Sequence, residues 1–439
     1  MKRTYIGRLL ATGLLMLTVT RSVKADMQAP QNILAPQSMS TPQSMSTAEA
    51  PSPAQAKARQ RAARFTSIGS PLQLAMSAAG PEPAYYIFNS TVPDGGFVIV
   101  AGSDSVAQAM GQGGVLAFSD KGELQPGNLP PALADWLDCC EARLSLCRQQ
   151  NRAPALRRSA DDTYIAPMLT TKWGQRNPYN HLAPEYAEWA NCSAGCLAVA
   201  MAQILKYWAS DTPCKEIPAY TTESLGIALE ALPATTFRYD MMKDSCQATQ
   251  FPNDSTLEVA RLMRYCGQAA EMDYDVNSGA NTSGEYLARY FGFSGDYTDK
   301  YHATHMTGWE DLLYRELSEG RPMLYSGKKY NGSGHVFVVD GYKDGYFHIN
   351  WGWDGSSNGF FGITLANPDD PDSAYLWEGY RWMQMAVIGL RPESTTAVEM
   401  TEMTPATISP SVYYDLNGRR VDHPRKGIYI KDNRKVSIK

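Results

Sequence analysis

The stretch Gly195-Cys196-Leu197-Ala198-Val199-Ala200-Met201-Ala202-Gln203-Ile204-Leu205-Lys206-Tyr207-Trp208 predicts a helix that is buried on most of its sides. Small and apolar residues fill nearly every position, and the only charge is Lys206. Cys196 lies in the first turn, where the positive end of the helix dipole favours thiolate over thiol. We therefore expect the thiol pKa to be lowered from about 8.5, which makes the sulfur a nucleophile.

The composition indicates a globular protein. The chain has 439 residues, enough for two or three domains, with 44% hydrophobic and 19% charged residues. The formal net charge of -5 gives no electrostatic reason to expect nucleic acid as a partner.

Residues 1–25 are typical of a signal peptide. Lys2, Arg3 and Arg8 form a basic start, a short apolar run follows from Leu9 to Val19, and small residues precede Asp26 at the expected cleavage point. The run is shorter than the roughly 20 residues that span a bilayer, and no other segment is long and apolar enough. We expect a secreted or cell-surface bacterial protein with no stable membrane span; an uncleaved N-terminal anchor is the alternative.

Export makes disulfides possible, and the chain has eight cysteines. Apart from Cys196, four of them lie in the middle of the chain, enough for two disulfides, and the alternative is that they are buried thiols. No spacing suits zinc, so we expect neither a metal site nor any cofactor.

The domain organisation follows from changes in composition. Residues 26–59 are predicted to form a flexible spacer, because 27–55 are rich in Pro, Ser, Gln and Ala and repeat Pro-Gln-Ser-Met-Ser-Thr at 36–41 and 42–47. Residues 60–158 form a small α+β unit with strands at 85–88, 97–100 and 115–118 and a helix opening at Pro130-Pro131. A polar linker from Arg152 to Asp162, with Arg157-Arg158 as a candidate processing site, precedes the domain assigned to 159–393.

That domain is predicted to be α+β as well. Helices around 194–208 and 255–268 come first, and strands at 322–326, 335–342, 346–351 and 359–363 follow. Residues 394–439 combine a second spacer with two or three short strands, too few for a stable core of their own.

Six histidines are candidates for the general base. His335 is the best placed, because it follows the loop Asn331-Gly332-Ser333-Gly334, which permits close substrate approach, and opens an apolar strand. Fifteen residues later, Asn350 offers a side-chain amide that can orient the imidazole, beside an indole that can screen the bond. His348 alternates with Phe347 and Ile349 and is interpreted as a packed sheet residue. His302 and His305 have a spacing that a helical metal site uses, but no third ligand accompanies them.

An oxyanion needs hydrogen-bond donors, and two are candidates. One is the backbone N–H of Cys196, and the other is Gln175 in Trp173-Gly174-Gln175-Arg176-Asn177-Pro178-Tyr179-Asn180. A serine hydrolase that uses Ser333 beside His335 is disfavoured, because the strand-turn-helix context of a nucleophile elbow is missing.

These motifs resemble the streptopain family of secreted bacterial cysteine peptidases, which includes interpain-type enzymes with a papain-like fold. The resemblance covers 163–393 in order and spacing: Trp173-x-Gln175, Pro178-Tyr179-Asn180, Gly195-Cys196-x-Ala198-x-Ala200-x-Ala202-Gln203, Gly334-His335-x-Phe337-x-x-Asp340-Gly341, Asn350-Trp351-Gly352-Trp353 and Gly359-Phe360-Phe361. The run from Tyr86 to Asn89 followed by Gly96-Phe97-Val98-Ile99-Val100-Ala101-Gly102 resembles the propeptide of that family.

The resemblance implies a zymogen with Cys196 as nucleophile, His335 as base and Gln175 as an oxyanion donor, whose own propeptide is an intramolecular inhibitor and whose substrates are proteins and peptides. Asn350 departs from papain, because Trp351 follows it directly, so Asn350, Trp351 and Trp353 remain alternatives for orienting His335. Gly334, Trp351 and Trp353 are expected to line the substrate site.

The tail pattern Tyr414-Asp415-Leu416-Asn417-Gly418-Arg419, with Lys426 to Ile430 and Lys435-Val436, resembles C-terminal sorting domains of Bacteroidetes proteins. This implies an outer-membrane secretion machinery as a partner, and a hairpin that merely caps the fold is the alternative. For the whole chain, an acyl transferase of the transglutaminase kind and a catalytically silent surface-binding homologue remain alternatives to the peptidase.

Overall fold

The computed structural model describes residues 51–65, 71–110, 112–149, 164–188, 190–248, 252–301, 308–328, 334–363 and 383–393, together with four short strands within 413–438. The predicted signal peptide and the linker from Arg152 to Asp162 lie outside the described residues, as do His302, His305 and Ser333. None of the helices within the described ranges combines the length and the apolar character that crossing a membrane requires.

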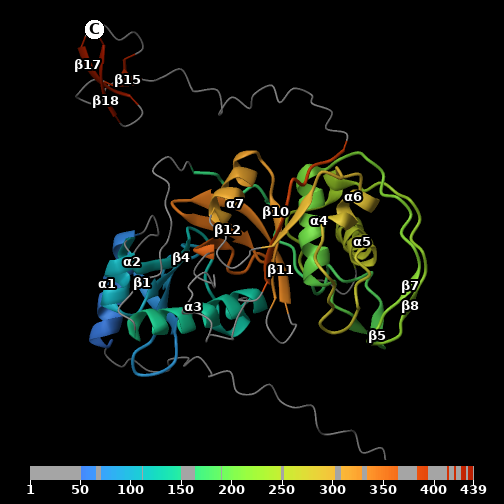
Figure 1. Cartoon of the computed structure of the whole chain (residues 1–439), viewed down its shortest axis with the longest axis horizontal. Helices are drawn as coiled ribbons and strands as arrows, with labels where there is room; N and C mark the ends of the chain where they lie inside the picture. The colour runs from blue at the N-terminus through green and yellow to red at the C-terminus, as the bar shows by residue number, and fades with distance from the viewer. Residues whose placement is uncertain are drawn as a thin grey trace, which may run out of the picture. The chain divides into compact units, whose positions relative to one another are not determined.

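A ten-stranded antiparallel sheet runs through both parts of the molecule (Figure 1). In spatial order its strands are β1 (Leu72–Ser77), β2 (Tyr85–Ser90), β3 (Phe97–Ala101), β4 (Val115–Ser119), β13 (Gly359–Phe361), β12 (Tyr346–Asn350), β11 (Gly334–Lys343), β10 (Met323–Lys328), β14 (Met383–Ile388) and β9 (Thr298–Tyr301). Each strand predicted for residues 60–158 and 159–393 is present, and the α+β class is confirmed.

The prodomain sheet and the catalytic sheet join where β4 pairs with β13. Phe118 lies opposite Phe360 and Ala117 opposite Phe361. The rings of Phe118 and Phe360 stack with centroids 5.3 Å apart, and Gly359 approaches Phe118 so closely that a Cβ would lie 2.7 Å from its carbonyl oxygen. The prosegment is therefore held by backbone hydrogen bonds as well as by packing.

Three helices belong to the prodomain: α1 (Pro53–Phe65), α2 (Asp104–Met110) and α3 (Pro131–Gln149). The first of them corrects the predicted spacer, because α1 begins within 26–59. Ala58 and Ala62, one turn apart, are fully buried, and Arg61 donates to the carbonyl of Ala101 at 2.6 Å. The sequence did not predict this helix, because its buried side is formed by two small alanines within an otherwise polar segment. Two 3-10 turns, η1 (Gln112–Gly114) and η2 (Pro126–Asn128), complete this part.

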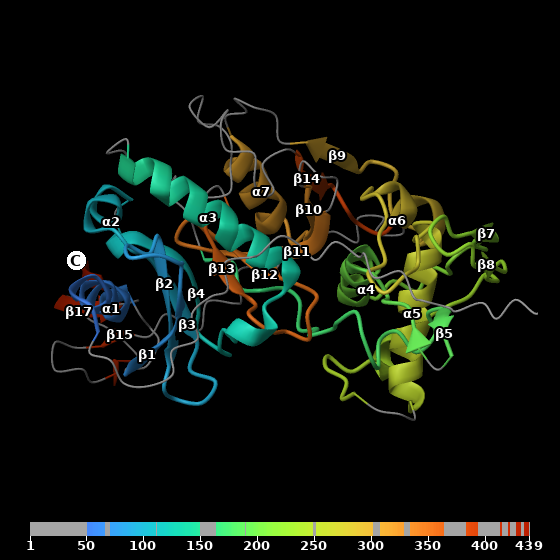
Figure 2. The same cartoon turned by 90° about the horizontal axis from the view of Figure 1, so that it is seen from below.

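The helix α3 extends across the sheet from α2 toward β11 and β12 (Figure 2). Its apolar residues, Leu133, Trp136, Leu137 and Leu144 among them, share one core with Phe337, Val339 and Trp351 of the catalytic domain. The Trp136 ring meets Phe361 edge-on at 5.2 Å. Prodomain and catalytic domain thus have a common hydrophobic core on this face of the sheet.

On the opposite face, α4 (Cys196–Trp208) packs against β11 and against α5 (Asp254–Ala269) (Figure 1). A capping box between Asn253 and Thr256 starts α5. The remaining helical segments are η3 (Tyr239–Met241), α6 (Glu285–Tyr290) and α7 (Trp309–Ser318), and two small hairpins comprise β5 (Glu185–Ala187) with β6 (Ala190–Asn191) and β7 (Tyr220–Thr221) with β8 (Ala228–Leu229).

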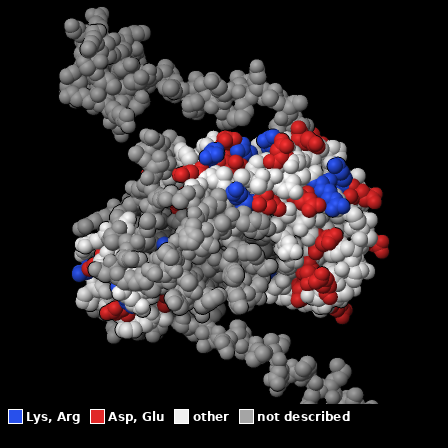
Figure 3. Space-filling view, in the orientation of Figure 1, with Lys and Arg blue, Asp and Glu red and all other residues white. Residues whose placement is uncertain are grey.

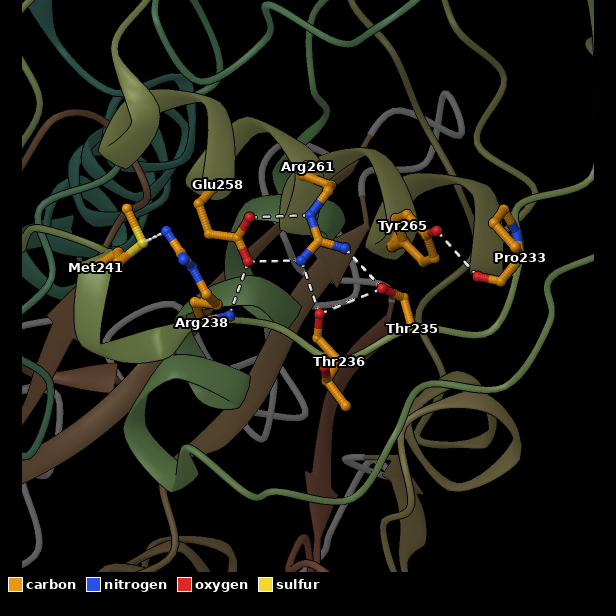
Figure 4. Close-up of polar contacts among 8 residues, drawn as sticks. All are labelled: Pro233, Thr235, Thr236, Arg238, Met241, Glu258, Arg261 and Tyr265. Atoms are coloured by element: carbon orange, nitrogen blue, oxygen red, sulfur yellow. Dashed lines mark hydrogen bonds and ion pairs between the residues drawn. The ribbon is translucent and has the colours of Figure 1, made fainter.

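The loop before η3 is attached to α5 by Arg261 (Figure 4). Its guanidinium donates to both carboxylate oxygens of Glu258, at 2.9 and 2.6 Å, and to Thr235 and Thr236 at 2.9 and 2.7 Å. The same group lies over the Phe237 ring, 4.7 Å from its centroid. A loop without regular structure is thereby fixed on the helix.

The tail contains a four-stranded antiparallel sheet of β15 (Tyr413–Tyr414), β16 (Arg420–Val421), β17 (Gly427–Lys431) and β18 (Arg434–Ile438). The sequence predicted two or three short strands, so strands are present as expected and one more is found.

Candidate active site

Gly195 and the first turn of α4 position Cys196. Gly195 has a φ of 87°, which favours glycine, and a Cβ there would lie 2.7 Å from the sulfur of Met272. From Leu197 to Leu205 every residue of the helix is buried. Cys196 is therefore held rigidly, as the sequence predicts.

The thiol itself differs from the expectation. Burial raises the pKa of the Cys196 thiol, and the backbone groups of Val336, Leu197 and Cys196 lower it by less. The predicted lowering by the helix dipole is wrong for this form of the chain, because desolvation of the thiolate outweighs the helix N-terminus. The cysteine is placed for chemistry but is not ionised by its helix alone.

His335 is the second residue of β11 and lies opposite Gly327 of β10. Side chains alternate along this strand: Val336 and Val338 pack in the core with α4, whereas Phe337 and Val339 pack in the core with α3. His335 shares its face with the second pair, and its Nε2 lies 3.7 Å from a carboxylate oxygen of Asp135 on α3. Gly334 is exposed at the start of the strand.

Asp135 was not singled out from the sequence. It precedes Trp136 in an ordinary amphipathic helix, and nothing in the spacing shows that this helix crosses the histidine strand. The contact is visible only when α3 is placed against β11.

Gln175 lies beside the residues that lead into α4. Its backbone carbonyl accepts from the N–H of Ala194 at 2.9 Å, and its side-chain oxygen accepts from the Ser193 hydroxyl at 3.2 Å. The Ser193 hydroxyl also accepts from the N–H of Gly195 at 3.3 Å. Because the amide oxygen is engaged, the amide nitrogen is the end of Gln175 that can donate to an oxyanion.

In this form of the chain the bonds of Asn350 go to other residues than His335, and its role in orienting the imidazole stays a prediction for the mature enzyme. Asn350 is 2% exposed; its oxygen accepts from Gln203 and Gly352 at 3.3 and 3.1 Å, and its nitrogen donates to the carbonyl of Thr171 at 2.8 Å. Within the described residues these bonds engage the amide oxygen and one N–H, and they connect α4, β12 and the segment before Gln175. In this form of the chain, Asn350 thus connects segments on which Cys196 and Gln175 also lie.

The two tryptophans of the same motif have different environments. Trp351 is buried between Phe337 and Phe361, with ring centroids 4.9 and 5.0 Å away, and donates to the carbonyl of Ser357 at 3.0 Å. Trp353 is partly exposed, and its indole N–H donates to Asn128 of η2 at 3.2 Å. In this form of the chain, the prodomain therefore covers one predicted substrate-binding residue directly.

His348 is a packed sheet residue, as predicted, and it contacts a buried carboxylate that the sequence did not reveal. Its Nδ1 lies 2.5 Å from the fully buried carboxylate of Asp340, which also accepts from the N–H of Leu169 at 2.9 Å. Through these contacts Asp340 connects the beginning of the catalytic domain, at Leu169, to β11.

No disulfide is formed among the eight cysteines, all of which are described. The described residues also contain no cluster of His, Cys, Asp and Glu that could hold a metal ion.

Comparisons with known proteins agree with this geometry. A family model described as the peptidase C10 family matches residues 173–361, and one described as the Spi protease inhibitor matches residues 37–144. The thiol protease/hemagglutinin PrtT of Porphyromonas gingivalis is 28% identical over 345 residues, which are 73% of this chain and 38% of that protein. Streptopain of Streptococcus pyogenes serotype M1 is 27% identical over 340 residues, which are 70% of this chain and 80% of that protein.

Among solved structures, a fragment of prointerpain A from Prevotella intermedia matches with a TM-score of 0.58 and 27% identity, over 72% of this chain and 98% of that one. Fold, cysteine helix and attached prosegment thus define a cysteine-type peptidase. The chain belongs to the streptopain family, the C10 family of cysteine peptidases.

Proposed function

We propose that this chain is the precursor of a secreted cysteine endopeptidase in which Cys196 and His335 carry out the chemistry. Once His335 is released from α3, its imidazole takes the proton of the Cys196 thiol. The thiolate attacks the scissile carbonyl, and the oxyanion accepts hydrogen bonds from the Cys196 N–H and from Gln175. His335 then protonates the leaving amine, and water hydrolyses the thioester.

The contact between Asp135 and His335 carries this proposal. It places a prosegment carboxylate 3.7 Å from the imidazole nitrogen, and the thiol pKa is raised in the same structure. A thiol that is desolvated and has no imidazolium partner is a poor nucleophile at neutral pH. The prosegment thus acts as an intramolecular inhibitor by engaging the base.

The ends of the chain have their own proposed roles. Residues 1–25 direct export, and the sheet of β15 to β18 directs recognition by an outer-membrane secretion machinery. N-terminal sequencing of the secreted form tests the first role and the boundary near Arg157. Secretion of a chain that ends at residue 393 would contradict the second.

The peptidase assignment is tested with Cys196→Ala in the full chain. The variant should fold, fail to cleave casein, and accumulate as the uncleaved precursor if maturation is autocatalytic. Cys246→Ala is the matched control, because Cys246 is also partly exposed but lies outside the site. Casein cleavage by the Cys196 variant would refute the assignment. No observation in the structure or the comparisons favours acyl transfer or a silent homologue.

A further inference from the structure

The turn that follows β12 brings a carboxylate to the candidate oxyanion segment. Asp354 lies directly after Trp353, and its backbone N–H donates to the carbonyl of Trp173 at 3.2 Å. Its carboxylate packs against Gly174, because a Cβ added to Gly174 would lie 2.6 to 2.7 Å from both carboxylate oxygens and from Cγ of Asp354. Gly174 is the residue before Gln175, so this carboxylate adjoins the place where the scissile carbonyl is expected.

Within the described residues, the Asp354 carboxylate forms no hydrogen bond and no ion pair. Lys172 packs its methylene groups over Gly355 but is not an ion-pair partner. Desolvation by the surrounding atoms raises the pKa of Asp354, and no cation offsets it. Two other acids with restricted solvent access are paired, Glu258 with Arg261 and Glu316 with Arg321. Asp354 is nevertheless exposed at the surface, so its carboxylate is accessible to a cation supplied by a ligand.

The chemistry of this place suits a basic side chain. Asp354 is exposed, and its neighbour Trp353 offers an indole face that can stack on a guanidinium or ammonium group. Among the described residues of the precursor, the prosegment group that is bonded to that indole is the neutral amide of Asn128. The described face in Figure 3 carries Asp and Glu side chains interspersed with Lys and Arg, so the proposed attraction is a local one that depends on Asp354 itself.

We propose that Asp354 is a specificity-determining residue that selects substrates with a Lys or Arg side chain close to the scissile bond. This inference rests on the proposed peptidase function and goes beyond it. The chain itself contains such a substrate sequence, because the segment between prodomain and catalytic domain carries Arg152, Arg157 and Arg158.

The test compares the mature wild type with Asp354→Asn and with Asp344→Asn. Asparagine keeps the size of the side chain and tolerates the positive φ, 54°, that both aspartates have. Asp344 lies in the turn between β11 and β12 and is the matched control for loss of one carboxylate. Each enzyme digests the same mixture of proteome-derived peptides, and mass spectrometry records the residues within two positions of every cut. A pair of synthetic peptides that differ only by Arg or Gln at the preferred position then gives kcat/KM.

We expect the wild type and the Asp344 variant to prefer Arg over Gln by about tenfold, the effect of roughly one close charge pair. The Asp354 variant should lose this preference while its kcat/KM on the Gln peptide stays unchanged. Two results with an active enzyme would overturn the inference. One is an unchanged preference for Arg in Asp354→Asn, and the other is an equal loss of kcat/KM on both peptides. Inactivity of the wild type on all peptides would instead overturn the proposed function, and this inference with it.

Discussion

Replacing Asp135 by Asn in the full precursor should release His335 and activate Cys196. Asn keeps the size of the side chain, so Trp136 beside it can keep its place in the common core. What changes is the carboxylate that lies 3.7 Å from the imidazole. His335 then becomes available to Cys196, whose thiol is held neutral by burial.

The size of the effect follows from this distance. If the imidazole of His335 is protonated, it and the Asp135 carboxylate are unit charges 3.7 Å apart, which interact with about 4 kcal/mol at an effective dielectric constant of 20. The side chains of His335 and Asp135 are 27% and 13% exposed, so solvent screening removes much of this. A remainder of roughly 1–2 kcal/mol corresponds to a change of about tenfold in the population of released His335.

The assay is the rate at which iodoacetamide alkylates Cys196 in the uncleaved precursor at neutral pH, followed by mass spectrometry. The rate should rise about tenfold in Asp135→Asn. Asp138→Asn is the matched control, because Asp138 is an exposed carboxylate on the same helix, one turn further along. Equal alkylation rates in the wild type and both variants would refute the view that Asp135 restrains the base.

Two further predictions concern stability. In the pair of Glu316 and Arg321, burial opposes ionisation, but two 2.8 Å bonds from Arg321 and one from the N–H of Gly389 hold the pKa of Glu316 below its ordinary value. Glu316→Gln should lower the free energy of unfolding by about 3 kcal/mol in urea at pH 7. Because the folded pKa of Glu316 is lowered, the pair stabilises the fold fully above the unfolded pKa of about 4.3 and loses its effect as the pH falls through the folded pKa. The free energy of unfolding of the variant should therefore fall less on acidification than that of the wild type. An equal fall in both proteins would contradict this. Arg261→Gln should lower the free energy of unfolding by about 2 kcal/mol and speed amide hydrogen exchange in residues 233–238. Unchanged exchange there would show that the bonds between Arg261 and Glu258 do not fix the loop.

The sequence predicts the helix of Cys196 and the strands around His335 because their patterns are local. An apolar run from Leu197 to Leu205 or an alternation beginning at His335 determines its own secondary structure whatever its neighbours are. The order of the motifs also indicates the family, since each motif contains several residues in fixed spacing.

What the sequence cannot show depends on contacts between distant segments. Asn350 has the residue type and the position of an orienting group, but its partners Gln203 and Thr171 lie about 150 and 180 residues earlier in the chain. The shift of the Cys196 pKa also depends on distant segments, because they bury the thiol and the burial raises its pKa. Sequence reasoning therefore predicts the nucleophile and the base, and the structure shows that the predicted base lies 3.7 Å from a carboxylate of the prosegment.

The way in which the prosegment is attached has a consequence for activation. The linker that carries Arg157 is one connection among several: β4 is hydrogen-bonded to β13, Trp136 packs on Phe361, and Asn128 accepts from Trp353. Cutting the linker leaves all of these contacts in place, because none of them depends on chain continuity. We therefore expect cleavage and release of the prosegment to be separate steps, and we expect the contact between Asp135 and His335 to be lost in the second one, when α3 leaves β11.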